Sequence, residues 1–194
     1  MTVLFTRNDY EAMPEGVPVE LLDGLLVKQP SPRWGHQRIQ NRILAALGAL
    51  LGPDAFGPRP LDVLVDEVNV FVPDIVVHDK PPDDEAQYVG VPAVVFEILS
   101  PSTEPRDREY KARRYLGLGV REVWLVDRVR QRIDIVDLDG ITSQVEDQSA
   151  RSRVIPGFEL TPSVLFASPW LTSRGGGGHA PSSGLSPARA LTRR

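Results

Sequence analysis

Two acidic residues interrupt apolar runs of the sequence, and a lysine follows a short distance downstream. Asp74 lies within the run Val68–Val77, Glu97 lies within the run Ala93–Leu99, and Lys111 belongs to the charged segment that comes next. Runs this rich in Val, Ile and Phe predict buried strands. An ionised carboxylate in a buried strand is costly unless a cation or hydrogen-bond donors compensate it. The pattern therefore predicts a divalent-metal site.

The two carboxylates can reach one point if their strands are neighbours, because strand side chains alternate between two faces. Their oxygens, together with waters and the backbone carbonyl of Ile98, suit Mg²⁺ or Mn²⁺ better than zinc. Two structural alternatives stay open, namely a turn formed by Asp74 after Pro73 and a buried salt bridge of Glu97. The presence of both acids favours the metal site.

Lys111 shares one face of a predicted helix with Asp107 and Tyr115, because the three residues are spaced four apart. The helix follows the Glu97 strand directly and should pack back over the sheet. Its lysine would then orient an attacking water or neutralise charge on a phosphate oxygen. The alternative is a surface ion pair between Lys111 and Asp107. We interpret Asp107 as the partner that orients Lys111 rather than as a metal ligand, and Tyr115 as a core residue.

His36 and Glu20 are candidates for accessory roles. His36 opens a predicted helix and lies one turn before Ile39, on its inward side. It would bind a phosphate or assist proton transfer, and the alternative is a capping or packing role. Glu20 lies in the apolar segment Val19–Leu22 of a predicted hairpin, where it faces either the site or solvent.

Periodicity and turn signals predict the elements that position these residues. From Trp34 onward the predicted order is helix, three strands, helix, strand, preceded by an N-terminal helix and a hairpin. This order predicts an α/β or α+β core, with a mixed β-sheet flanked by helices. The predicted segments are a helix over Thr6–Met13, a hairpin over Val17–Lys28 turning at Asp23–Gly24, a helix over Trp34–Leu51, strands over Leu61–Val65 and around Asp74 and Glu97, a helix over Glu104–Leu118, and strands over Glu122–Val126 and Arg132–Leu138.

Composition excludes several classes of chemistry. Cysteine is absent, so the chain has no disulfide or thiolate metal site, which fits a reducing cytoplasm. The sequence contains no G-x-S-x-G, P-loop or G-x-G-x-x-G motif, which argues against a serine nucleophile and against a nucleotide cofactor. No apolar stretch approaches the roughly 20 residues of a membrane span, and the N-terminus lacks a secretory pattern. We therefore expect a cytoplasmic protein with no membrane partner.

The charge is unevenly distributed along the chain. The formal net charge is −4, and residues 168–194 hold four arginines and no acidic residue, so residues 1–167 carry −8. Such an acidic body weighs against non-specific binding of nucleic acid, which needs clustered Lys and Arg. Residues 168–194 are rich in Gly, Ser, Pro and Arg and cannot bury a core, which predicts a disordered tail after a single domain over residues 1–167.

Deleting residues 168–194 is expected to leave the thermal unfolding midpoint nearly unchanged, because a segment without a core makes few packed contacts. Thermal denaturation of the full chain and of residues 1–167 under the same conditions tests this. A fall of many degrees on deletion would mean that the segment docks on the domain.

The site residues resemble a known pattern. Pro73–Asp74, Glu97-Ile98-Leu99 and the downstream Lys111 are similar to the PD-(D/E)XK nuclease superfamily, whose core order matches the one predicted above. The chain departs from that pattern at Leu99, where the superfamily has a lysine.

The local motifs narrow the resemblance to the Uma-two family of endonucleases, in which the lysine has moved to the helix. The resemblance covers about Thr6 to Phe166 and implies a third acid, Glu20, at the metal. The motifs that carry it are Glu20–Gly24, His36, Asn69–Asp74, Phe96–Ser102, Asp107 through Lys111 to Tyr115, and Gly119–Asp127.

The leading hypothesis is an Mg²⁺- or Mn²⁺-dependent endonuclease that hydrolyses phosphodiester bonds of DNA. Asp74, Glu97 and the Ile98 carbonyl would hold the ion, and Lys111 would steer the attacking water. Cutting two strands requires two active sites, which favours a homodimer. The alternative is a non-catalytic nucleic-acid-binding or assembly module on a nuclease scaffold. The acidic body and Leu99 favour this alternative, whereas the retained Asp74, Glu97 and Lys111 argue against it.

Overall fold

The computed structural model describes residues 4–14, 16–52, 55–58, 61–80, 83, 88–101 and 104–168. Of the predicted tail, only Ser168 lies among these residues. The helices are α1 (Arg7–Glu11), α2 (Trp34–Leu51), the π-helix η2 (Arg106–Lys111), α3 (Ala112–Leu118) and α4 (Pro162–Phe166). The strands are β1 (Val19–Leu22), β2 (Leu25–Lys28), β3 (Phe56–Pro58), β4 (Asp62–Asp66), β5 (Asn69–Phe71), β6 (Ile75–Val77), β7 (Tyr88–Val89), β8 (Val94–Leu99), β9 (Glu122–Asp127), β10 (Arg132–Asp137), β11 (Gly140–Val145), β12 (Ala150–Arg151) and β13 (Glu159–Leu160).

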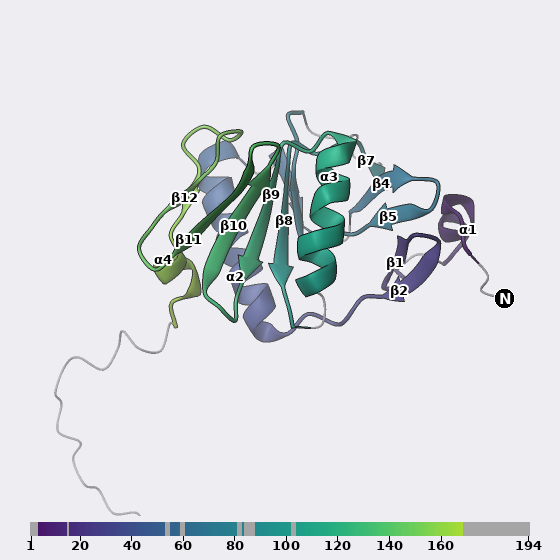
Figure 1. The fold of residues 1–194 in the computed structure, drawn as a ribbon, viewed down its shortest axis with the longest axis horizontal. Coiled ribbons are helices and arrows are strands. Elements are labelled where there is room, and N and C mark those ends of the chain that lie inside the picture. Colours follow the sequence, from purple (N-terminus) through teal and green to yellow (C-terminus); the bar gives the residue numbers. More distant parts are fainter. Residues whose placement is uncertain are drawn as a thin grey trace, which may run out of the picture.

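Two main sheets organise the fold (Figure 1). The larger sheet has six strands in the order β11-β10-β9-β8-β6-β3, and only its β8–β9 pair is parallel among the described pairings. The smaller sheet has five strands in the order β2-β1-β5-β4-β7, and β12 and β13 form a separate pair. The predicted class is confirmed, because the fold is a mixed α+β arrangement with helices against the sheets.

The six-stranded sheet buries a different core on each face. On one face α2 contributes Ile39, Ile43 and Leu47, which pack with Phe96 and Trp124. On the other face η2 and α3 cover the sheet, and Figure 1 shows α2 and α3 on opposite sides of it. This second core contains Val95, Leu99, Tyr115, Val123 and Leu125. Alternation along β8 therefore sends Glu97, together with Val95 and Leu99, toward η2 and α3.

The bounds of α2 and the hairpin turn are as predicted, whereas α1 covers Arg7–Glu11 rather than the predicted Thr6–Met13, with Thr6 as its N-cap. Helix α2 spans Trp34–Leu51 and ends at Gly52, which has a φ of 80°. The β1–β2 hairpin turns at Asp23 and Gly24, whose φ angles of 47° and 76° are the positive values that a tight hairpin turn requires. Within the described residues, no helix is both long enough and apolar enough to span a membrane.

The expectation that Val68–Val77 forms one strand through Asp74 is wrong. The segment forms β5 in the five-stranded sheet and β6 in the six-stranded sheet, with a break at residues 72–74. Pro73 has no N–H for a sheet ladder and lies in this break. Asp74 therefore directly precedes β6, at the point where the chain crosses between the two sheets. With β3 and β7 added, six strands rather than three separate α2 from η2.

The predicted helix after Glu97 is also divided. Its first part, η2, is π-helical, and its second part, α3, ends at Gly119 in the left-handed conformation with a φ of 110°. Asp107 and Lys111 lie in the π-helical part and are both buried. Short π-helical segments are rare in proteins, and those that occur are often found at functional sites.

Candidate active site

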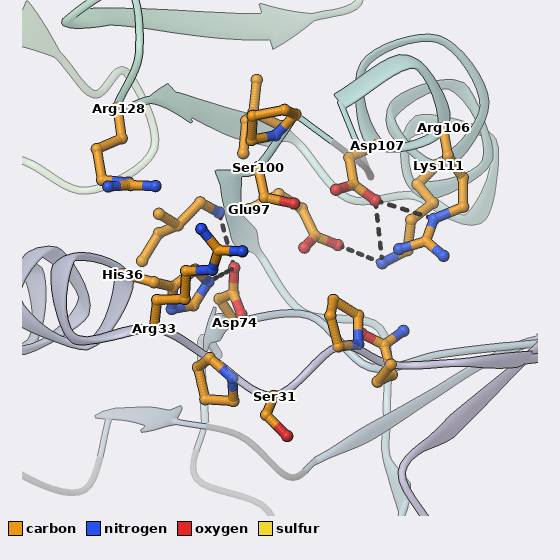
Figure 2. Close-up of a pocket in the computed structure, with 16 residues that line it drawn as sticks. Ser31, Arg33, His36, Asp74, Glu97, Ser100, Arg106, Asp107, Lys111 and Arg128 are labelled. Carbon is orange, nitrogen blue, oxygen red and sulfur yellow. Dashed lines mark hydrogen bonds and ion pairs between the residues drawn. The ribbon is translucent and has the colours of Figure 1, made fainter.

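A cavity of about 260 Å³ opens beyond the carboxyl ends of the parallel strands β8 and β9 (Figure 2). Its walls come from the segment before α2, the first turn of α2, the end of β8, η2 and the turn after β9. The charged and titratable residues that line it are Arg33, His36, Asp74, Glu97, Arg106, Asp107, Lys111 and Arg128. The structure thus brings six of the seven candidate residues, Ile98 included, to the cavity wall, and the seventh, Glu20, contacts Lys111.

Asp74 is held by groups from two other elements. Its Oδ2 accepts a hydrogen bond of 2.7 Å from the Ile98 backbone N–H and lies 3.1 Å from Nε2 of His36. Gln40, one turn after His36 on α2, donates a hydrogen bond of 2.9 Å to the Asp74 carbonyl. Both the side chain and the backbone of Asp74 are therefore fixed. His36 contacts Asp74 from the inward side of α2, as the helical spacing predicted.

Glu97 is buried and directs one oxygen toward the helix layer. Its Oε1 accepts hydrogen bonds of 2.8 Å from Nζ of Lys111 and 2.9 Å from the hydroxyl of Tyr115. Its Oε2 accepts no hydrogen bond from the described part of the chain. Burial raises the pKa of Glu97 to about 8, although the Lys111 charge opposes this shift. The protonated form of Glu97 is therefore well populated at neutral pH.

Lys111 is one of the most deeply buried side chains, with an exposed fraction of 1%. Its Nζ lies 2.6 Å from Oε1 of Glu20 and 2.8 Å from Oε1 of Glu97, while Oδ1 of Asp107 is 3.7 Å away. Burial by itself would lower the pKa of Lys111, but these carboxylates more than offset it and raise the pKa. The alternative of a surface ion pair is wrong, and Leu99 is packed in the core.

Glu20 is fully buried, so the alternative of a solvent-facing hairpin residue is also wrong. Its Oε1 accepts a hydrogen bond of 2.8 Å from the Val72 backbone N–H and contacts Lys111. Its Oε2 lies 3.4 Å from the guanidinium of Arg106. Glu20 therefore connects the hairpin to the break before β6 and to the lysine. Glu20 and Glu97 therefore both contact the Lys111 ammonium.

Sequence reasoning assigned Tyr115 to the core and missed the hydrogen bond that it donates to Glu97. Burial and the neighbouring Glu97 carboxylate raise the pKa of Tyr115 well above its ordinary value, so its hydroxyl keeps its proton. The spacing of Tyr115 four residues after Lys111 was the available signal. No comparable pattern in the sequence points to Arg33 and Arg128, which come to the cavity through the tertiary fold.

The described residues do not form a preformed set of three or more metal ligands. Within the part of the chain that the structure describes, no group of three or more His, Asp or Glu side chains has an arrangement suited to a metal ion. The acids of the cavity instead divide their contacts, since Asp74 faces His36 and the Ile98 backbone, whereas Glu97 and Glu20 share Lys111.

Sequence comparison assigns the chain to a family. A family model for Uma2, described as "Putative restriction endonuclease", matches residues 7–163. The chain belongs to this family. The family match covers Glu20, His36, Asp74, Glu97 and Lys111, and it confirms the resemblance drawn from the motifs. Among curated proteins, none matches the chain.

A solved structure has a similar fold. It is described as a "putative nuclease belonging to DUF820" from Anabaena variabilis and superposes with a TM-score of 0.74 at 22% sequence identity. The match covers 84% of this chain and 97% of that chain. At this identity the likeness establishes a shared fold, and the family match supports a nuclease-like function.

Proposed function

We propose that the chain is a divalent-metal-dependent endonuclease that hydrolyses phosphodiester bonds of DNA. The observation that carries this proposal is the position of Asp74, Glu97 and Lys111 around one cavity, in a member of the family described as "Putative restriction endonuclease". Two acids and a lysine in a buried pocket provide oxygen ligands for a hard cation and a positive charge for a phosphate.

The donor set fits Mg²⁺ or Mn²⁺. Mg²⁺ keeps several waters and is commonly bound through only one or two carboxylates, so a site without a third acid is suitable. Asp74 supplies one carboxylate, and Glu97 supplies an Oε2 that no described residue engages. The Ile98 N–H points to Asp74, and the carbonyl of a strand residue points to the same side as its N–H. Asp74, Glu97 and the Ile98 carbonyl are therefore the proposed ligands.

The bound ion would supply Lewis-acid activation of the phosphate and a water of lowered pKa. The chain's own residues supply orientation and charge. Lys111 is fixed between Glu20 and Glu97 and would hold the attacking water and stabilise negative charge on the phosphate. His36 fixes the Asp74 carboxylate and is placed to contact a phosphate oxygen or accept a proton.

Glu20 has a different role in this proposal from the one that the family resemblance implies. Its Oε1 contacts Val72 and Lys111, its Oε2 lies 3.4 Å from Arg106 without a hydrogen bond from a described residue, and Glu20 does not line the cavity. We assign it to positioning Lys111 rather than to the metal. Asp107, at 3.7 Å from Lys111 and 3.2 Å from Arg106, has the orienting role expected for it.

The test is a cleavage assay joined to a metal titration. Purified protein with Mg²⁺ or Mn²⁺ is expected to nick or cut DNA, and EDTA should abolish the reaction because the ligands alone provide no activated water. Isothermal titration calorimetry should show an Mg²⁺- or Mn²⁺-binding site that Asp74→Asn removes. Cleavage that persists in EDTA would contradict metal dependence. Metal-free, inactive protein that still binds DNA would favour the non-catalytic module.

Cleavage of both strands of a duplex needs two active sites, so we also propose that the active form is a homodimer. Sedimentation equilibrium of the full chain measures this directly. A monomer that nicks only one strand would remove the dimer from the proposal and leave the chemistry unchanged.

A further inference from the structure

Two arginines of the cavity have no partner among the residues that the structure describes. Arg33 immediately precedes α2, and Arg128 follows β9; both line the cavity. Neither side chain forms an ion pair or hydrogen bond with another described residue, and Nε of Arg128 is buried without a partner. The third arginine of the cavity, Arg106, is 3.4 Å from Glu20 and 3.2 Å from Asp107. Because buried polar groups are normally paired, the buried and unpartnered Nε of Arg128 indicates an anionic ligand, and the exposed Arg33 adds a second positive charge to the same cavity.

The two arginines lie at the same end of α2. A Cβ atom built on Gly35 would come within 2.9 Å of Nη1 of Arg128, so this guanidinium lies directly against the first turn of the helix. Figure 2 shows Arg33 and Arg128 on the His36 side of the cavity, away from Arg106 and Lys111. Planar guanidinium groups bind phosphate through paired N–H donors. Together they provide phosphate contacts beside the proposed reaction centre.

An exposed tryptophan follows Arg33 directly in the chain. Trp34 stands between Arg33 and Gly35 in the chain, so its Cα is about 3.8 Å from that of Arg33. Its side chain is 79% exposed, whereas Trp124 is fully buried in the core. An indole offers a flat face on which a nucleobase stacks, and stacking on aromatic side chains is a general way of binding single-stranded nucleic acid.

We propose that Arg33, Arg128 and Trp34 form a binding site for an unpaired nucleotide beside the cavity, at the start of α2. The arginines bind the phosphates that flank the nucleotide, and Trp34 stacks on its base. In a duplex the faces of each base are covered by its neighbours, so the site selects a single-stranded segment, an overhang or a frayed end. The inference rests on the proposed function, because it names the form of nucleic acid that the same cavity accepts.

The test measures binding without cleavage. Fluorescence anisotropy in EDTA follows the full chain with labelled oligothymidylate of about 12 nucleotides, with oligouridylate, and with a duplex of the same length. Trp34→Ala should weaken oligothymidylate binding about 5- to 150-fold, which corresponds to the usual strength of one stacked base. Trp34→Phe should retain most of the affinity, and Trp34→Leu should lose it, since leucine is apolar but has no π face.

The arginines have a separate measurable effect. Replacing both Arg33 and Arg128 by alanine removes two phosphate contacts, and the slope of log affinity against log salt should become shallower by about 1.4. Leu138→Ala and Arg113→Ala are the matched controls, because Leu138 is 85% exposed and Arg113 forms no ion pair with a described residue. Neither residue lines the cavity, and neither change should alter affinity or slope.

Three results would overturn the inference. The first is equal affinity of Trp34→Leu and the wild type for oligothymidylate. The second is tighter binding of the duplex than of oligothymidylate. The third is a dimer that dissociates in Trp34→Ala, because Trp34 would then be a contact between two copies of the chain. The affinities for oligothymidylate and oligouridylate show whether the bound nucleotide belongs to DNA or to RNA, and tighter binding of either one supports the site. Mg²⁺-dependent cleavage with binding unaffected by Trp34→Ala would remove this inference alone. Trp34-dependent binding without cleavage would remove the proposed function alone.

Discussion

Replacing Asp74, Glu97 or Lys111 by alanine is expected to lower the rate of DNA cleavage about 100-fold or more in each case. The two acids carry the oxygens proposed to hold the ion, and the lysine carries the charge proposed to stabilise the phosphate. Groups that act as a unit lose most of their effect when any one is removed. Double variants should therefore be little slower than the single ones, as measured by initial rates in Mg²⁺.

Loss of folding has to be separated from loss of chemistry. Lys111→Ala leaves the buried carboxylates of Glu20 and Glu97 without their cation, which typically costs about 3–5 kcal/mol of stability. Asp74→Asn and Glu97→Gln keep the side-chain shape and are the informative variants, with thermal midpoints and circular dichroism as the check on folding. Asp139→Asn is the matched control, because Asp139 is 85% exposed on the β10–β11 turn. Full activity in folded Asp74→Asn or Glu97→Gln would contradict the assignment.

Local chemistry explains why the sequence alone indicated that Asp74, Glu97 and Lys111 would be neighbours. A charged residue in a strongly apolar run is buried with the run, so it needs a partner of opposite charge or several donors. The hydrophobic pattern thus predicts both the burial of Glu97 and its need for a cation, and the nearest cation on an inward helix face is Lys111. Helix α2 was predictable for a similarly local reason, since its apolar spacing and its stop at Gly52 lie in one continuous segment.

The parts that escaped prediction depend on pairing between distant segments. Pro73 signalled an interruption after Val72, but only the tertiary fold sends β5 and β6 to different sheets. That crossing is what places Asp74 beside Ile98 and opens the Val72 N–H to Glu20. Glu20 reads as an ordinary hairpin residue because nothing in its own segment shows that Lys111 will lie 2.6 Å away.

The charge balance of this cluster links its stability to its proposed chemistry. Lys111 and Arg106 are two cations against the three carboxylates of Glu20, Glu97 and Asp107, so they compensate only part of the combined negative charge. Asp74, Glu20 and Asp107 all act to raise the pKa of Glu97, in addition to its burial. A divalent ion beside Asp74 and Glu97 would supply the missing positive charge. The fold without metal therefore holds Glu97 partly protonated, and metal binding should release that proton.

Glu97→Gln is accordingly expected to be more stable than the wild type at alkaline pH and about equally stable at pH 5. The pKa of Glu97 is raised to about 8 in the folded chain from an ordinary 4.5. A raised pKa contributes stability that is fully present below the unfolded pKa and is lost as pH rises through the folded pKa. Glutamine resembles the protonated acid at every pH, so the difference in free energy of unfolding should grow to about 1–4 kcal/mol by about pH 9.

Urea denaturation of both proteins between about pH 5 and 9 measures this difference, and groups such as His78 that are common to both cancel. The raised pKa of Lys111 adds little in this range, because its contribution is lost only above the ordinary lysine pKa. Saturating Mg²⁺ at neutral pH should cancel most of the difference, since an ion at 100 times its dissociation constant stabilises the wild type by about 2.7 kcal/mol and has no complete site in Glu97→Gln. A difference that stays flat with pH, or an Mg²⁺ effect equal in the two proteins, would show that Glu97 is a permanently charged partner of Lys111 and not a metal ligand.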